Sequence, residues 1–167
     1  MKLLGIASCR FVNFVDFLFR LRKEVKAMIV LIDSLAAVCL ILAWWVAFSS
    51  YPRLPERIPV HFGLSGEADS WGGRWMIFLM PAVATLIFGM DWFIFSRLKG
   101  SPKMPAAMEL PLHLLMLELT ALFAYITWRT SEVAFERAKG LGVWFLPVVL
   151  LGIMGTSAWM IVAGKAH

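Results

Sequence analysis

The sequence contains few charged residues and almost no cysteine. Only 16% of the 167 residues are Asp, Glu, Lys or Arg, whereas 60% are hydrophobic, and the mean hydropathy is +0.78. A water-soluble domain usually carries about 25% charged residues, so the composition indicates a membrane protein. Cys9 and Cys39 are isolated along the chain, and without a partner at a similar depth they exclude a disulfide framework.

Motifs of known enzyme classes are absent as well. The chain has no nucleophile elbow, phosphate-binding glycine loop, CxxC pair or HExxH motif. Each of these motifs supplies a nucleophile, a phosphate site or a metal site to a known chemistry. No reaction class follows from the sequence, so we expect a protein that is not an enzyme and that needs no cofactor.

Four hydrophobic runs are long enough to cross a bilayer. A transmembrane helix needs roughly 20 apolar residues, because it crosses about 30 Å of hydrocarbon and must pair its backbone polar groups internally. We expect an all-α integral membrane protein in which four transmembrane helices form one bundle, a single domain over residues 27–164. The predicted spans are residues 27–48, 75–95, 105–128 and 141–164.

Lysine and arginine are distributed unequally between the segments that flank these runs. Ten of the 16 lie in the N-terminal arm, the second link and the C-terminal tail, and six lie in the first and third links. Because basic residues in short flanks remain in the cytoplasm, we expect a multi-pass protein of the plasma (inner) membrane with both termini cytoplasmic. The pI of about 9.6 is then explained by the basic residues that keep these segments in the cytoplasm. The expected partner is the lipid bilayer, and nucleic acid is not expected.

Residues 1–26 form an arm before the first span. Over residues 10–26 hydrophobic side chains recur at spacings of three and four, with polar side chains between them. This pattern predicts an amphipathic helix that lies in the plane of the cytoplasmic interface.

The first link, residues 49–74, is long for a connection between neighbouring helices. Its prolines stiffen the chain and its tryptophans anchor it, so we expect an ordered extracellular loop. Turns at glycines bring His61, Glu67 and Asp69 towards one another. These three side chains are candidate ligands for Zn²⁺ or Ca²⁺, although they also suit a structural network with neighbouring arginines or the recognition of a ligand.

The run Tyr51–Trp75, YPRLPERIPVHFGLSGEADSWGGRW, resembles the signature YPxLPxxIPxHFxxxGxxDxxxxK of a bacterial membrane domain family of unknown function. The same unit forms the N-terminal half of the SdpI-type immunity proteins. The resemblance implies a bacterial plasma-membrane protein of the kind that confers resistance to a secreted peptide toxin or acts in signalling. The loop residues expected to bind a ligand are His61, Phe62, Gly66, Glu67, Asp69, Trp71 and Arg74.

Ionisable residues also occur inside the hydrophobic runs, where they are costly. Asp33, Asp91 and Glu109 each lie roughly 6 to 8 Å from the same, cytoplasmic, surface. His113 follows Glu109 by about one helical turn, whereas Glu118 lies nearer the bilayer centre. These five residues form a predicted intramembrane polar cluster. It either relays protons, carries ions or binds a metal ion, or it reaches the headgroups and pairs with lysines.

Three functions are consistent with these features. The first is the binding or sensing of a ligand, such as a peptide toxin, through residues 51–75. The second is a membrane enzyme or an ion or proton carrier that uses the polar cluster. The third is a structural subunit with a membrane protein partner, because small residues in the fourth run favour close helix packing.

Overall fold

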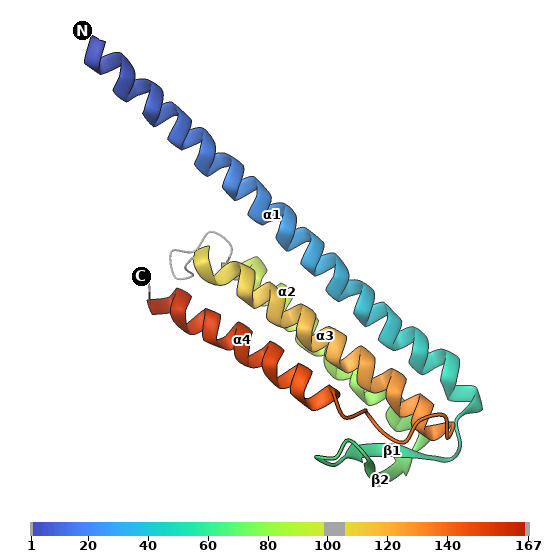
Figure 1. Cartoon of the computed structure of the whole chain (residues 1–167). Coiled ribbons are helices and arrows are strands. Elements are labelled where there is room, and N and C mark those ends of the chain that lie inside the picture. The colour runs from blue at the N-terminus through green and yellow to red at the C-terminus, as the bar shows by residue number, and fades with distance from the viewer. Residues whose placement is uncertain (1, 99–105, 166–167) are drawn as a thin grey trace.

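The computed structural model describes residues 2–98 and 106–165, which are mostly helical. Two strands and two 3₁₀ helices separate the first two long helices. Figure 1 shows the strands at one end of the helix bundle, the hairpin end, and both chain termini towards the other. The elements are α1 (Lys2–Ser50), η1 (Tyr51–Arg53), β1 (Arg57–Phe62), β2 (Ala68–Gly73), η2 (Arg74–Phe78), α2 (Leu79–Leu98), α3 (Ala106–Ala134) and α4 (Phe145–Lys165).

Four of the described helices are long and apolar enough to cross a membrane, as the sequence predicts. Their outer faces carry large hydrophobic side chains such as Trp45, Leu86 and Leu151, which are between 66% and 74% exposed. A bilayer would cover these faces. The chain is therefore an all-α membrane protein, with candidate spans over Arg20–Arg53, Arg74–Arg97, Met108–Ala134 and Phe145–Lys165.

The arm and the first span form one helix. No glycine or proline lies between Gly5 and Pro52 to interrupt it, and α1 runs over 49 residues, or about 74 Å. Its N-terminal part continues the axis of the span beyond the other helices (Figure 1). The arm is thus helical as predicted, but it extends the span instead of turning into the plane of the interface.

The boundaries of the last two spans also differ from the sequence prediction. α3 continues past residue 128 to Ala134, and α4 begins at Phe145 instead of residue 141. Arg129 allows the extension because its guanidinium leaves the helix and donates to the carbonyl of Gly140, with Nε 2.9 Å from the oxygen. Gly142, with a φ of 95°, delays α4, because this left-handed conformation cannot continue a right-handed helix.

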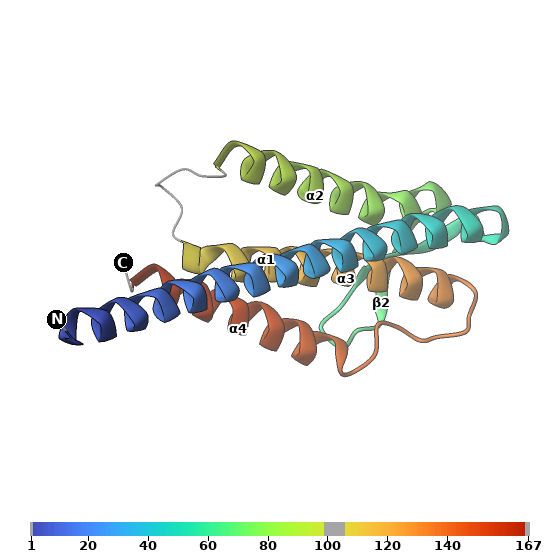
Figure 2. The ribbon, with the colours of Figure 1, turned by 90° about the horizontal axis from the view of Figure 1, so that it is seen from above.

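α3 is the central helix, and it contacts each of the other three. Seen from above, α2 and α4 lie on opposite sides of α1 and α3 (Figure 2). α1 turns a row of buried small side chains inwards, Ala36, Ala43 and Ala47, which permits close helix approach. Between α1 and α2, the indole of Trp44 donates to the hydroxyl of Thr85 at 2.9 Å.

The first link folds into an antiparallel β-hairpin of β1 and β2. The inner side of β1 is apolar, and Ile58 is fully buried. Burial of one such side chain contributes about 2 to 3 kcal/mol. The main buried cluster therefore lies where the hairpin meets the ends of the helices, and it comprises Ala47, Leu54, Ile58, Ile77 and Ala134.

The tip of the hairpin docks on the connection between α3 and α4. The N–H of Leu141 donates to the carbonyl oxygen of Gly66 at 2.8 Å. Gly66 has a φ of 77°, which favours glycine. On the other side, the Tyr125 hydroxyl donates to the carbonyl of Leu141 at 2.7 Å. The hairpin is thereby tied to α3 through the connection.

The close approach of Gly140 to Gly66 gives a test of this docking. A Cβ added at Gly140 would meet the carbonyl oxygen of Gly66, whereas a Cβ at Gly89 has nothing within 4 Å. Gly140→Ala should therefore lower the free energy of unfolding by about 1 to 3 kcal/mol and make the hairpin more sensitive to protease. Gly89→Ala, in the interior of α2, should not lower the free energy of unfolding, because alanine favours a helix more than glycine does, and should leave the protease resistance of the hairpin unchanged. Equal protease resistance of the Gly140 variant and the wild type would contradict the docking.

Candidate functional site

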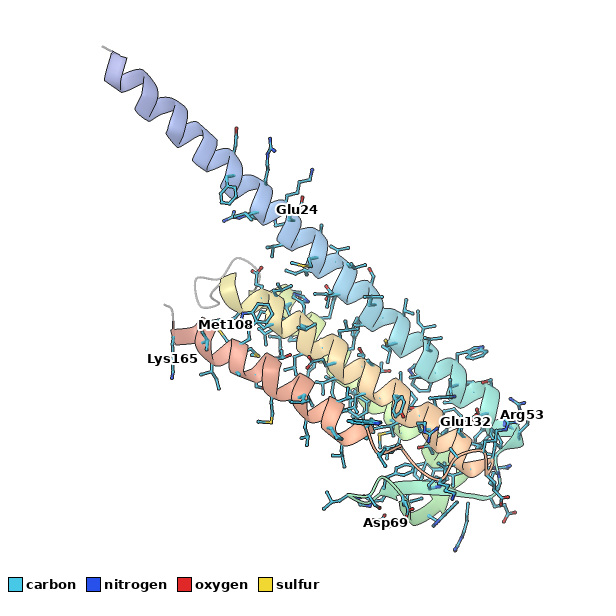
Figure 3. The ribbon with its side chains drawn as sticks, in the orientation of Figure 1. Glu24, Arg53, Asp69, Met108, Glu132 and Lys165 are labelled. Atoms are coloured by element: carbon cyan, nitrogen blue, oxygen red, sulfur yellow. The ribbon has the colours of Figure 1, made fainter. Side chains whose placement is uncertain are left out.

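Two polar regions at different depths of the bundle are candidates for function. Figure 3 places Arg53 and Asp69 at the hairpin end, whereas Met108 and Lys165 lie at the other end. The predicted loop residues belong to the first region. The predicted intramembrane residues lie along α1, α2 and α3.

His61 and Asp69 meet across the hairpin. His61 Nδ1 lies 2.6 Å from Asp69 Oδ1, and the two side chains are 68% and 50% exposed. Glu67 does not join them in a metal-binding group: no set of three or more His, Cys, Asp or Glu side chains within the described residues could hold a metal ion. Its backbone instead pairs with Gly140. Two of the three candidate ligands are thus brought together.

Three of the predicted ligand-binding residues lie against other parts of the loop or the bundle. Gly66 forms the docked tip of the hairpin. The guanidinium of Arg74 lies over the ring of Tyr51, 5.2 Å from its centroid. Phe62 is half-buried and lines a mainly apolar cavity of about 210 Å³ between the hairpin, α2 and α3. Gly66 and Arg74 therefore hold the loop, whereas Phe62 faces a cavity beneath it.

A larger hollow, of about 570 Å³, opens at the surface beside Trp71. Trp71 is 49% exposed. The sequence alone does not bring the other charged and aromatic residues of this hollow to Trp71. Arg53 and Arg57 count towards the predicted topology, Arg57 is also an expected partner of the loop acids, and the residues that follow α3 are distant in sequence from the loop. The residues that define the hollow are Arg53, Arg57, Trp71, Phe135 and Glu136.

The second region lies within the helix bundle. His113 Nδ1 on α3 lies 2.7 Å from Asp33 Oδ1 on α1, and the two side chains are 12% and 36% exposed. Phe95 of α2 stacks on the imidazole, with ring centroids 4.4 Å apart. Asp91 also lies on α2, and its side chain is half-buried. Residues of three helices, α1, α2 and α3, therefore meet around or near His113.

The two other members of the predicted cluster, Glu109 and Glu118, lie on α3. Glu118 points to α4, where the hydroxyl of Thr156 donates to its Oε1 at 2.7 Å. Its Oε2 is buried and has no hydrogen-bond partner among the described residues. Glu109 is half-buried in the first turn of α3. Of the five predicted residues, the structure joins Asp33 and His113 in direct contact and directs Glu118 to α4.

Comparisons with known proteins match the hairpin and its flanking helices. Residues 38–85 match the model of a domain of unknown function, DUF1648. Over 49 residues the chain is 37% identical to an uncharacterized protein of Archaeoglobus fulgidus; the match covers 29% of this chain and 27% of the archaeal protein. The chain thus spans about a quarter of the length of that relative. No solved structure matches. The matched region agrees with the predicted resemblance to a membrane domain of unknown function.

The two histidine–aspartate pairs allow a matched experiment. Asp33→Ala leaves His113 without its partner inside the bundle, and it should lower the free energy of unfolding by about 1 to 3 kcal/mol. Asp69→Ala removes an exposed partner and should cost less than about 1 kcal/mol. Unfolding in lipid bicelles measures both values. An equal loss of unfolding free energy in the two variants would show that the His113–Asp33 pair does not connect α1 to α3.

Proposed function

We propose that this membrane protein acts like the SdpI-type immunity proteins and binds or senses a peptide, such as a peptide toxin, at the hairpin end. In this proposal the hairpin end faces the outside of the plasma membrane and both termini face the cytoplasm. The observation that supports it best is the open hollow of about 570 Å³ beside Trp71. Recognition sites commonly combine such a concave surface with an aromatic anchor.

The rigidity of the hairpin supports the same proposal. The buried cluster holds β1 against the helices, and the bond from Leu141 to Gly66 holds its tip. A site that is ordered before binding loses less conformational entropy when a ligand binds. Trp71 lies on β2, where it is paired with Pro59, so its backbone position is fixed.

Expression in a bacterium that is sensitive to a secreted peptide toxin tests this function. The wild-type chain should raise survival above that of cells with an empty vector. Trp71→Ala should reduce protection at least tenfold, because truncation of an anchoring aromatic residue usually costs 2 kcal/mol or more. Survival is measured by colony counts over a series of toxin concentrations.

Trp75→Ala is the matched control for this experiment. Trp75 is 64% exposed but does not line the hollow, so this variant should protect cells as the wild type does. Immunoblots of membranes establish that all variants are present in equal amounts. Survival equal to the empty vector with every toxin, or equal protection by the two alanine variants, would count against the proposal.

The polar group within the bundle favours a second candidate function, the transport of protons or ions. The 2.7 Å contact of His113 with Asp33 places two ionisable side chains between α1 and α3, and Asp91 lies half-buried on α2. Ionisable residues inside spans commonly mark ion pathways or proton relays.

Reconstitution in liposomes with an entrapped pH-sensitive dye tests this candidate. The wild-type protein should dissipate an imposed pH gradient faster than empty liposomes do, and His113→Gln should reduce the rate to that of empty liposomes. Glu118→Gln removes a carboxyl group that is directed at α4 instead, so it should retain the rate. If the wild type and the empty liposomes behave alike, with either protons or monovalent cations, the second candidate is wrong.

A further inference from the structure

The hollow beside Trp71 carries charges of both signs that are not paired with each other. Arg53, Arg57 and Glu136 all line it. None of the three forms an ion pair within the part of the chain that the structure describes, where the bridges are His61–Asp69, His113–Asp33 and Arg137–Glu132. Charged groups that face one hollow without neutralising each other remain available to a ligand.

Two contacts within the protein restrict the side chain of Arg53. One of its terminal nitrogens donates to the carbonyl of Ser49 at 3.2 Å, and its guanidinium lies over the ring of Phe135, 5.9 Å from the centroid. Both contacts reduce the freedom of the side chain while leaving other N–H groups unused. A guanidinium fixed in this way suits the bidentate binding of a carboxylate.

Glu136 occupies a position that usually belongs to glycine. It has a φ of 59° and follows α3, where the N–H of Arg137 donates to the carbonyl of Glu132 at 2.9 Å. Helices commonly end with a glycine in this left-handed conformation. A glutamate here is strained, and strain of this kind tends to be retained where the side chain has a use. Glu136 is exposed and lines the hollow, so binding of a ligand there would be such a use.

We infer that the hollow binds the C-terminal end of a peptide, with the terminal carboxylate between Arg53 and Arg57, a basic side chain against Glu136, and an apolar side chain on Trp71 and Phe135. The inference rests on the proposed function and names the chemistry of its ligand. A zwitterionic lipid headgroup carries the same two charges. The apolar acyl chains of such a lipid stay in the bilayer, whereas a peptide can place an apolar side chain beside the two charges, so the two aromatic rings favour the peptide.

Defined peptide pools test this inference with the full chain in lipid nanodiscs. Random heptapeptides are prepared as free C-terminal acids and as C-terminal amides, and the bound fraction is quantified by mass spectrometry. The acid pool should be retained roughly tenfold better than the amide pool, since a charge-assisted pair of hydrogen bonds is lost on amidation. Retained peptides should be enriched in Lys or Arg and in hydrophobic residues.

Four variants assign the two charge preferences. Arg57→Gln, alone and with Arg53→Gln, should remove the preference for the acid pool. Arg137→Gln should keep it, because Arg137 stacks on the same Phe135 ring but pairs with Glu132 at 3.6 Å and lies outside the hollow. Glu136→Gly should abolish the enrichment of basic residues and keep the acid preference. It should also raise the melting temperature by about 2 to 4 °C, since it relieves the strained backbone.

The outcomes separate this inference from the proposed function. Equal retention of the acid and amide pools, with Trp71→Ala still weakening both, would overturn the inference and leave peptide binding in place. If soluble short-chain phosphatidylethanolamine displaces the bound peptides at lower concentrations than the free-acid peptides do, that result would assign the hollow to a lipid headgroup and overturn the inference. If neither pool is retained above empty nanodiscs, both the inference and peptide binding fail.

Discussion

The docking of the hairpin tip on the connection between α3 and α4 is the contact on which the rest of the hairpin end depends. The N–H of Leu141 donates to the carbonyl of Gly66, and Gly140 lies so close to Gly66 that no side chain fits between them. A two-stranded hairpin is marginally stable by itself. This docking and the buried face around Ile58 together hold the hairpin in one position against the ends of the helices. The hollow beside Trp71 has walls from both the hairpin and the residues after α3, so it exists only while they stay together.

α3 joins the two polar regions of the molecule. Near its C-terminal end, Tyr125 and Arg129 hold the connection through the carbonyls of Leu141 and Gly140. About 18 Å away along the same helix, His113 contacts Asp33 of α1. The outer pair of His61 and Asp69 is exposed, whereas the side chain of His113 is only 12% exposed. Electrostatic interactions strengthen where water is excluded. The His113–Asp33 pair, and not the exposed His61–Asp69 pair, is therefore the one that can hold α1 and α3 together.

Much of this arrangement could be predicted from the sequence, and the remainder could not for physical reasons. Length and hydropathy are enough to locate four spans. The common depth of Asp33, Asp91 and Glu109 predicts a polar cluster. The structure shows direct contact between Asp33 and His113. Glycines and prolines in the first link predict an ordered loop. The arrangement of Phe135 and Glu136 beside Trp71 depends on a contact between distant segments, which no local pattern encodes. Likewise, the direction of Glu118 towards Thr156 follows from helix rotation, which hydropathy does not specify.

Hydrogen exchange at the amide of Leu141, with the protein in lipid nanodiscs, tests the central contact most directly. This amide lies in a short connection and would exchange rapidly if it faced water. If the hairpin tip is docked, the Leu141 amide should be protected as strongly as the β1 amides are. All of these amides should lose their protection together when the hairpin is released. Exchange at the rate of an unstructured peptide, while β1 remains protected, would contradict the docking.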